Sequence, residues 1–443
     1  MIDWYLMLFI GLTVLISNMK YFGEHKTKAD YLFHKQEFGL SEGTFRILFG
    51  TLSGTTVLLP IYLMQKIGYL GGFVLAMVGL FTLYGYSLFA PRIKTRLLNL
   101  LRHPSQIKPM TKKMMMYVLV LINVEGFLIQ ALLAEEVLTT VLHVPTSLPL
   151  LVICFSCFIF AGMGGSIGVQ KVGSFLLICL FLGMTIIPIS LYLTQGINPT
   201  FQAITSRFPL FLETDHNQLF LYSLLVFIIM SGYLVTNISV NTSLMKIKEK
   251  RLKLSLTISA FCWMSVSIAF TAIYIYFIGQ SGAISTFYTS LVEQLSPILL
   301  YLFVISSLSM FIMSAASSLF SVASLMVLIQ KKSNFQKLYI RLCGLSFLPL
   351  LLHVYVEDLL QFAIIFYGNL FAACLPIFYY FLKKERELEV SMFIPICLVS
   401  LGVFGTLFSL YTSFIQGVLL SFIFAWICLL INKIFFVIYF SEK

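Results

Sequence analysis

The apolar segment GTFRILFGTLSGTTVLLPIYLM, residues 43–64, is interrupted near its middle by Leu52-Ser53-Gly54-Thr55-Thr56. Its length suits a transmembrane helix, which needs about 20 predominantly apolar residues. The interruption combines a glycine with small hydroxyl side chains. Paired glycine-interrupted segments of this kind are a sequence sign of helices that are broken near the middle of the bilayer. We therefore predict a membrane span whose helix is broken at residues 52–56.

The composition of the whole chain is that of a membrane protein. It has 443 residues, of which 59% are hydrophobic and 11% charged, and its mean hydropathy is +0.96. Soluble proteins are about 45–50% apolar and about 25% charged, so a water-soluble enzyme is excluded. The apolar segments are continuous and do not alternate, which disfavours a β-barrel. The sequence predicts an all-α polytopic membrane protein with one membrane domain, residues 1–443.

A window of about 19 residues predicts thirteen membrane spans. They cover residues 3–19, 43–64, 68–90, 113–142, 147–164, 167–194, 217–245, 253–279, 296–329, 336–356, 358–381, 391–411 and 415–440. Basic residues test this number, because they collect on the cytoplasmic side. With the N-terminus outside and the C-terminus inside, only Lys66 and Arg207 of the 29 basic residues fall outside. The net charge of +11 therefore reports orientation in the membrane and does not indicate nucleic acid.

A second interrupted segment lies in the seventh span. Met230-Ser231-Gly232-Tyr233-Leu234 follows the first interruption by five spans, and because five is odd the two would have opposite orientations in the membrane. Such pairs indicate inverted repeats around a binding site, although glycine also allows close helix packing. We expect a first helix and cytoplasmic loop over 1–42, repeats over 43–194 and 217–382, and two C-terminal helices over 391–443.

Several motifs resemble the sodium:solute symporter family, and they occur in that family's order. Lys28-Ala29-Asp30-Tyr31-Leu32 is similar to the loop before its first core helix. Gly162-Met163-Gly164-Gly165-Ser166-Ile167-Gly168-Val169 resembles its Gly-Gly signature between the fourth and fifth core helices. Met313-Ser314-Ala315-Ala316-Ser317-Ser318-Leu319 resembles its serine-rich eighth core helix, and Leu375-Pro376 the end of the tenth.

This resemblance implies a divergent member with a LeuT-type fold of five-plus-five inverted repeats, one helix before the core and two after it. It also implies secondary active transport of a small solute by alternating access, coupled to a cation. Family sodium lies between the broken first core helix and the eighth core helix. The matching positions here are the carbonyls of Leu52, Thr55 and Phe311 and the hydroxyl of Ser314, and such oxygens suit a hard cation.

Two departures from the family pattern leave other functions open. The hydroxyl that usually follows the eighth-helix serine is absent at Ala315, and the family's Thr-Asp pair is Val172-Gly173. Both losses lower the expected cation affinity in a low-dielectric site. One alternative is a proton-coupled or uncoupled relative that uses Glu125. The other is a sensor or membrane subunit that works with a membrane partner protein.

Glu125 lies near the middle of the 113–142 span. An ionisable side chain there costs at least about 2.5 kcal/mol on insertion scales and is a functional-site hypothesis by default. We predict a coupling carboxylate or a solute contact, against the alternative of a protonated packing residue. The predicted solute-binding residues are Ser53, Gly54, Thr56, Glu125, Tyr233, Asn237 and Asn369, with Gln130 as a weaker polar candidate.

Enzymatic chemistry is not expected. The sequence has no phosphate-binding loop, no HExxH motif and no nucleophile elbow. Cys154 and Cys157 form a lone CxxC inside an apolar span, where buried packing is the expected role. The expected partners are a small-molecule solute and the lipid bilayer, and the expected location is a cell membrane, the cytoplasmic membrane of a bacterium.

Overall fold

The structure is a computed structural model that describes most of the chain. The described residues are 27–33, 37–102, 109–142, 147–207, 212–213, 215–281, 287–329, 335–353, 356–383 and 393–440. Within these ranges the chain is helical, and the only β pairing is an isolated bridge between Phe38 and Ile247.

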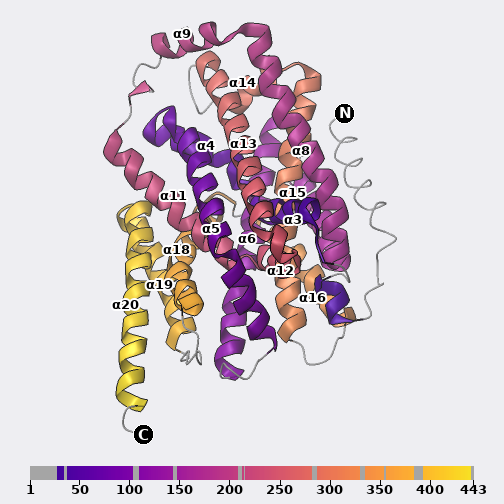
Figure 1. Ribbon diagram of the computed structural model, residues 1–443. Helices are drawn as coiled ribbons and strands as arrows, with labels where there is room; N and C mark the ends of the chain where they lie inside the picture. Colours follow the sequence, from indigo (N-terminus) through magenta and orange to yellow (C-terminus); the bar gives the residue numbers. More distant parts are fainter. Residues whose placement is uncertain are drawn as a thin grey trace.

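The helices form one bundle (Figure 1). The first half contains α2 (Lys28–Phe33), α3 (Leu40–Thr51), α4 (Thr55–Ile67), α5 (Leu70–Arg102), α6 (Pro109–Leu142), α7 (Ser147–Cys157), the π-helix η3 (Phe158–Met163), α8 (Gly165–Gln195) and α9 (Ile197–Arg207). The second half contains α11 (His216–Thr236), α12 (Ile238–Lys246), α13 (Glu249–Ser281), α14 (Phe287–Gln294), α15 (Pro297–Ile329), α16 (Phe335–Ser346), α17 (Leu348–Leu352), α18 (Val356–Lys383), α19 (Phe393–Tyr411) and α20 (Phe414–Phe440).

The predicted all-α polytopic architecture is confirmed. Among the described residues, ten helices are long and apolar enough to cross a membrane, and the pair α3 and α4 forms an eleventh, broken span. The fifth predicted span matches the shorter apolar helix Ser147–Met163, and the first, residues 3–19, lies outside the described residues. The total of thirteen spans and the orientation stay predictions.

The helix break predicted at residues 52–56 is confirmed. Helix α3 ends at Thr51, and its C-cap residue Leu52 has an extended backbone at φ −71° and ψ 122°. Helix α4 begins after Gly54. The two helices are bent by 56°. The break leaves the last carbonyls of α3 without their helical donors, so other groups must satisfy them.

The second break was predicted at Ser231-Gly232-Tyr233, and that position is wrong. Helix α11 runs unbroken through Gly232 and ends at Asn237, where the backbone is extended and the side chain accepts a hydrogen bond from the Val240 amide. Gly232 instead allows the backbone of α18 to approach, because a Cβ there would overlap the Phe371 carbonyl. The Ser-Gly pair therefore serves close packing, and an asparagine cap one turn later breaks the helix.

Gly232→Ala is expected to destabilise the fold by about 1–3 kcal/mol, because α11 and α18 must separate to admit the methyl group. The matched control is Gly85→Ala on α5, where an added Cβ would meet no atom within 4 Å. The measurement is thermal unfolding in detergent. A similar midpoint for both variants would contradict this packing role.

Helix α15 forms the centre of the bundle. It is buried almost continuously from Phe303 to Leu325 and packs against α3, α6, α8 and α12. Helices α18, α19 and α20 pack against one another at one side of the bundle (Figure 1). The broken span α3 and α4 thus lies against the serine-rich helix that the sequence singled out.

The segment with the Gly-Gly signature, residues 162–169, contacts Tyr31 of α2. The Tyr31 hydroxyl donates a hydrogen bond to the Gly162 carbonyl at 2.7 Å, and its ring packs on Gly165. Gly165 has φ +54°, a left-handed conformation that favours glycine. Two of the motifs that carried the family resemblance therefore contact each other.

Candidate functional site

A central cavity of about 160 Å³ lies beside the α3–α4 break. Its walls come from both sides of the break and from α5, α6, α11, α13, α15, α18 and α20. The lining residues are Thr51, Ser53, Thr55, Thr56, Leu59, Tyr62, Leu63, Leu75, Ile129, Gln130, Leu225, Val226, Ile229, Met230, Tyr233, Trp263, Ser314, Ser318, Ile364, Tyr367, Gly368, Phe371 and Phe414. Most are apolar or aromatic, and their polar groups are hydroxyls and amides.

Side chains from the second half of the chain satisfy the freed carbonyls of α3. The Gly50 carbonyl accepts hydrogen bonds from the Tyr233 hydroxyl at 2.6 Å and from Asn237 Nδ2 at 2.8 Å. The Thr51 carbonyl accepts one from Trp263 Nε1 at 3.2 Å. The first break is thus held by the cap residue of the second, so the two broken helices meet at one carbonyl group.

The predicted sodium ligands lie on two facing elements. Gly54 packs against the Phe311 ring, so the break and α15 are in contact. Thr55 and Ser314 line the same cavity, and Ser314 is buried. Backbone and hydroxyl oxygens are what a small hard cation needs.

The positions of the two family departures carry no side-chain oxygen. Ala315 and Val172 are buried, at 0% and 3% exposure. Gly173 packs against the ring of Phe49, which would meet an added Cβ at 2.5 Å. A carboxylate at position 173 would therefore have no room beside Phe49.

Of the predicted solute-binding residues, Ser53, Thr56 and Tyr233 line the cavity, while Gly54 lies at its edge against Gln130. Asn369 does not reach it. Its Nδ2 donates to Ser409 Oγ at 3.1 Å and its Oδ1 accepts from Ser421 Oγ at 2.8 Å, so it joins α18 to α19 and α20. Asn237 also lies outside the lining, because its amide is used at the two breaks.

No family model and no curated protein sequence matches the chain, but solved structures do. A Na⁺-coupled sialic acid symporter in a substrate-bound outward-open state aligns with a TM-score of 0.73 at 13% identity, covering 97% of this chain and 96% of that one. The chain has the LeuT-type transporter fold. MhsT in complex with L-phenylalanine aligns at TM-score 0.55 and 14% identity, with 90% and 99% coverage. A manganese transporter from Eremococcus coleocola aligns at 0.52 and 11%, with 88% and 94% coverage.

Two of these three similar structures are named as a symporter and a transporter. Nearly the whole chain takes part in the first alignment, so the LeuT-type fold includes the two C-terminal helices as well as the core.

Glu125 does not line the central cavity of this LeuT-type fold, but it interacts electrostatically with the lining residue Tyr367. It is buried at 8% exposure, and its Oε2 has no hydrogen-bond partner. A Cβ on the neighbouring Gly126 would lie 2.6 Å from the Tyr367 hydroxyl and 3.2 Å from Ser318 Oγ, both of cavity-lining residues. Glu125 is thus not among the lining residues, and its role in coupling or solute contact stays a prediction.

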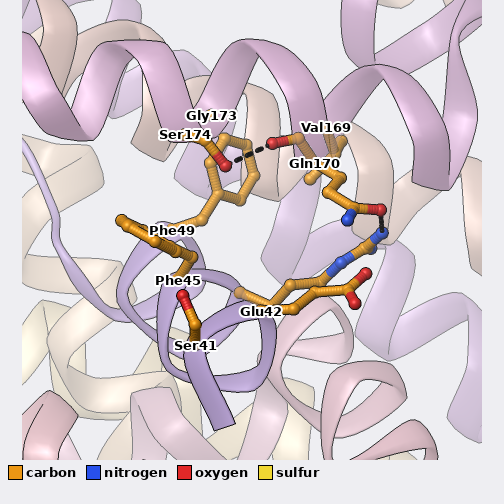
Figure 2. Close-up of a pocket in the computed structure, with 9 residues that line it drawn as sticks. Ser41, Glu42, Phe45, Phe49, Val169, Gln170, Gly173 and Ser174 are labelled. Atoms are coloured by element: carbon orange, nitrogen blue, oxygen red, sulfur yellow. Dashed lines mark hydrogen bonds between the residues drawn. The ribbon is translucent and has the colours of Figure 1, made fainter. Parts of the chain in front are cut away.

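Sequence reasoning missed a second cavity, of about 240 Å³, between α3 and α8 (Figure 2). Arg46 lines it and is only 5% exposed. Its guanidinium donates to Ser166 Oγ and the Ser166 carbonyl, both at 2.9 Å, and to Gln170 Oε1 at 3.0 Å. The arginine thereby joins the first half of the broken helix to the helix that follows the Gly-Gly signature. No local sequence pattern predicts these hydrogen bonds of Arg46, since the partners are 120 or more residues away in the sequence.

Proposed function

We propose that the chain is a secondary active transporter that moves a small solute across a bacterial cell membrane by alternating access, coupled to a cation. The observation that carries this proposal is the convergence of both helix breaks on the Gly50 carbonyl beside the central cavity. Discontinuous helices that meet at a midplane site are the usual construction of alternating-access transporters. We further propose residues 43–194 and 217–382 as the inverted repeats.

Sodium is the coupling ion that the site favours. The Leu52, Thr55 and Phe311 carbonyls and the Ser314 hydroxyl are its proposed ligands, and a symporter with a similar structure is Na⁺-coupled. A ligand that binds only the folded chain stabilises it by RT ln(1 + [L]/Kd). We expect sodium chloride at about ten times Kd to add about 1.4 kcal/mol to the free energy of unfolding.

The experiment compares thermal unfolding in sodium chloride with unfolding in choline chloride at equal ionic strength. It is followed by uptake of a panel of radiolabelled sugars and amino acids into proteoliposomes with an inward sodium gradient, an inward proton gradient or neither. Sodium-dependent stabilisation with sodium-driven uptake supports the proposal. Solute binding without any gradient-driven uptake, together with a co-purifying protein, would replace it with a sensor or membrane subunit.

Proton coupling through Glu125 is the second candidate, because this carboxylate is buried, has an oxygen without a hydrogen-bond partner, and interacts electrostatically with the cavity residue Tyr367. If Glu125 carries the proton, Glu125→Gln abolishes uptake driven by a proton gradient, since an amide cannot release a proton. The matched control is Glu136→Gln on the exposed side of the same helix. Uptake by Glu125→Gln that keeps its dependence on a proton gradient would exclude this role.

A further inference from the structure

We infer that the central cavity takes a solute without net charge, which carries both an aromatic or similarly bulky apolar group and hydrogen-bond donors. The inference rests on the proposed function, since it assigns the solute class of the same cavity. It follows from two kinds of lining side chains, an aromatic wall and a polar wall.

The first wall is aromatic. The Tyr233 and Phe371 rings meet edge-on with centroids 5.5 Å apart, and the Tyr367 and Phe371 centroids are 3.9 Å apart. Trp263 and Phe414 add two more aromatic side chains to the lining. Aromatic rings favour edge-to-face or offset contact with another ring. This wall therefore suits a solute with a flat apolar group.

The second wall is polar and has hydrogen-bonding capacity left over. Gln130, on α6, is only 3% exposed and donates from Nε2 to Ser53 Oγ at 3.2 Å, while its Oε1 has no partner. The Thr51 hydroxyl, 4% exposed, has no partner either. Leaving a buried acceptor unpaired costs about 1–3 kcal/mol. A hydroxyl, amide or amino hydrogen of the solute would satisfy Gln130 Oε1.

The lining disfavours a solute with net charge, whereas backbone and hydroxyl oxygens can surround a small sodium ion. No Asp, Glu, Lys, Arg or His is among the described residues that line the cavity. A buried ion without a partner is strongly unfavourable, because desolvation is not compensated by a counter-charge. An anionic sugar acid or a divalent cation, of the kinds named for two of the similar structures, would find no opposite side-chain charge here.

The test uses ligands that share one ring and differ in charge. Equilibrium binding to the purified full chain is measured by calorimetry in sodium chloride for 2-phenylethanol, 2-phenylacetamide, phenylacetate and phenethylamine, with glucose as a neutral solute without an apolar end. We expect the two net-neutral ring compounds to bind at least about tenfold more tightly than phenylacetate and phenethylamine, and glucose not to bind. Preference for phenylacetate, phenethylamine or glucose, or failure of both net-neutral ring compounds to bind, would overturn the inference.

Two variants locate the binding. Gln130→Glu places a carboxylate at the unpaired acceptor with little change in shape, so we expect the preference to move about tenfold toward phenethylamine. The control is Gln361→Glu, an exposed position on α18, which is expected to leave the preference unchanged. An unchanged preference in Gln130→Glu would overturn the assignment. Because binding needs no ion gradient, binding without gradient-driven uptake would refute the transport function and leave the solute class standing.

Discussion

Gly54→Ala is expected to abolish sodium-dependent stabilisation and gradient-driven uptake while the chain still folds. A Cβ at this position would overlap the ring of Phe311 and lie 2.5 Å from Gln130 Oε1. Phe311 is 0% exposed on the central helix α15 and cannot retreat. The break must open instead, which moves the Leu52 and Thr55 carbonyls away from α15. Ligand distances in a metal site tolerate only about 0.2 Å, so we expect sodium affinity to fall by more than about tenfold.

The control for this experiment is Gly85→Ala, a helix glycine with no atom within 4 Å of an added Cβ. Sodium-dependent unfolding and proteoliposome uptake are measured for both variants and for the original chain. If Gly54→Ala kept the original sodium dependence, the ion could not bind between the α3–α4 break and α15.

The sequence predicted the first break correctly and misplaced the second for a physical reason. Gly54 and Gly232 each follow a serine within an apolar segment, so the two local patterns are alike. The chain around Gly232 stays helical because α18 packs directly on it. The break occurs at Asn237, whose side chain caps α12 and also donates to the Gly50 carbonyl, 187 residues away. A contact over that distance has no signature in the local sequence.

Helix rotation limited the prediction of the site. Gly368 lines the cavity, whereas the adjacent Asn369 contacts α19 and α20, because neighbouring residues of an α-helix differ by about 100° around its axis. A helix that is apolar on all faces gives no periodic signal to fix that rotation. Tyr233 and the polar residues could be predicted from the sequence, but Phe371 of the aromatic wall could not, since phenylalanine occurs throughout the chain.

Ser314 and Ala315 provide a pair of changes with opposite expected effects on sodium affinity. Ser314→Ala removes a hydroxyl from the lining of the cavity, and we expect sodium affinity to fall by at least about tenfold, as for other losses around a metal site. Ala315→Ser adds a hydroxyl where the resembling family has one, and we expect sodium affinity to rise, because a hard cation gains from each added oxygen ligand.

Matched controls separate ligation from packing in this pair. Ser324→Ala removes a buried hydroxyl of the same helix, at 0% exposure and without a partner, farther along α15 from the break, so it is expected to keep the original sodium dependence. Ala315→Cys adds a side chain of about the size of serine with a sulfur atom that is a poor sodium ligand. The sodium concentration that gives half-maximal stabilisation is measured for all four variants. A higher value for Ser314→Ala and a lower one for Ala315→Ser, with both controls unchanged, would place sodium on α15. The same value in all four would remove α15 from the coupling site and direct attention to Glu125.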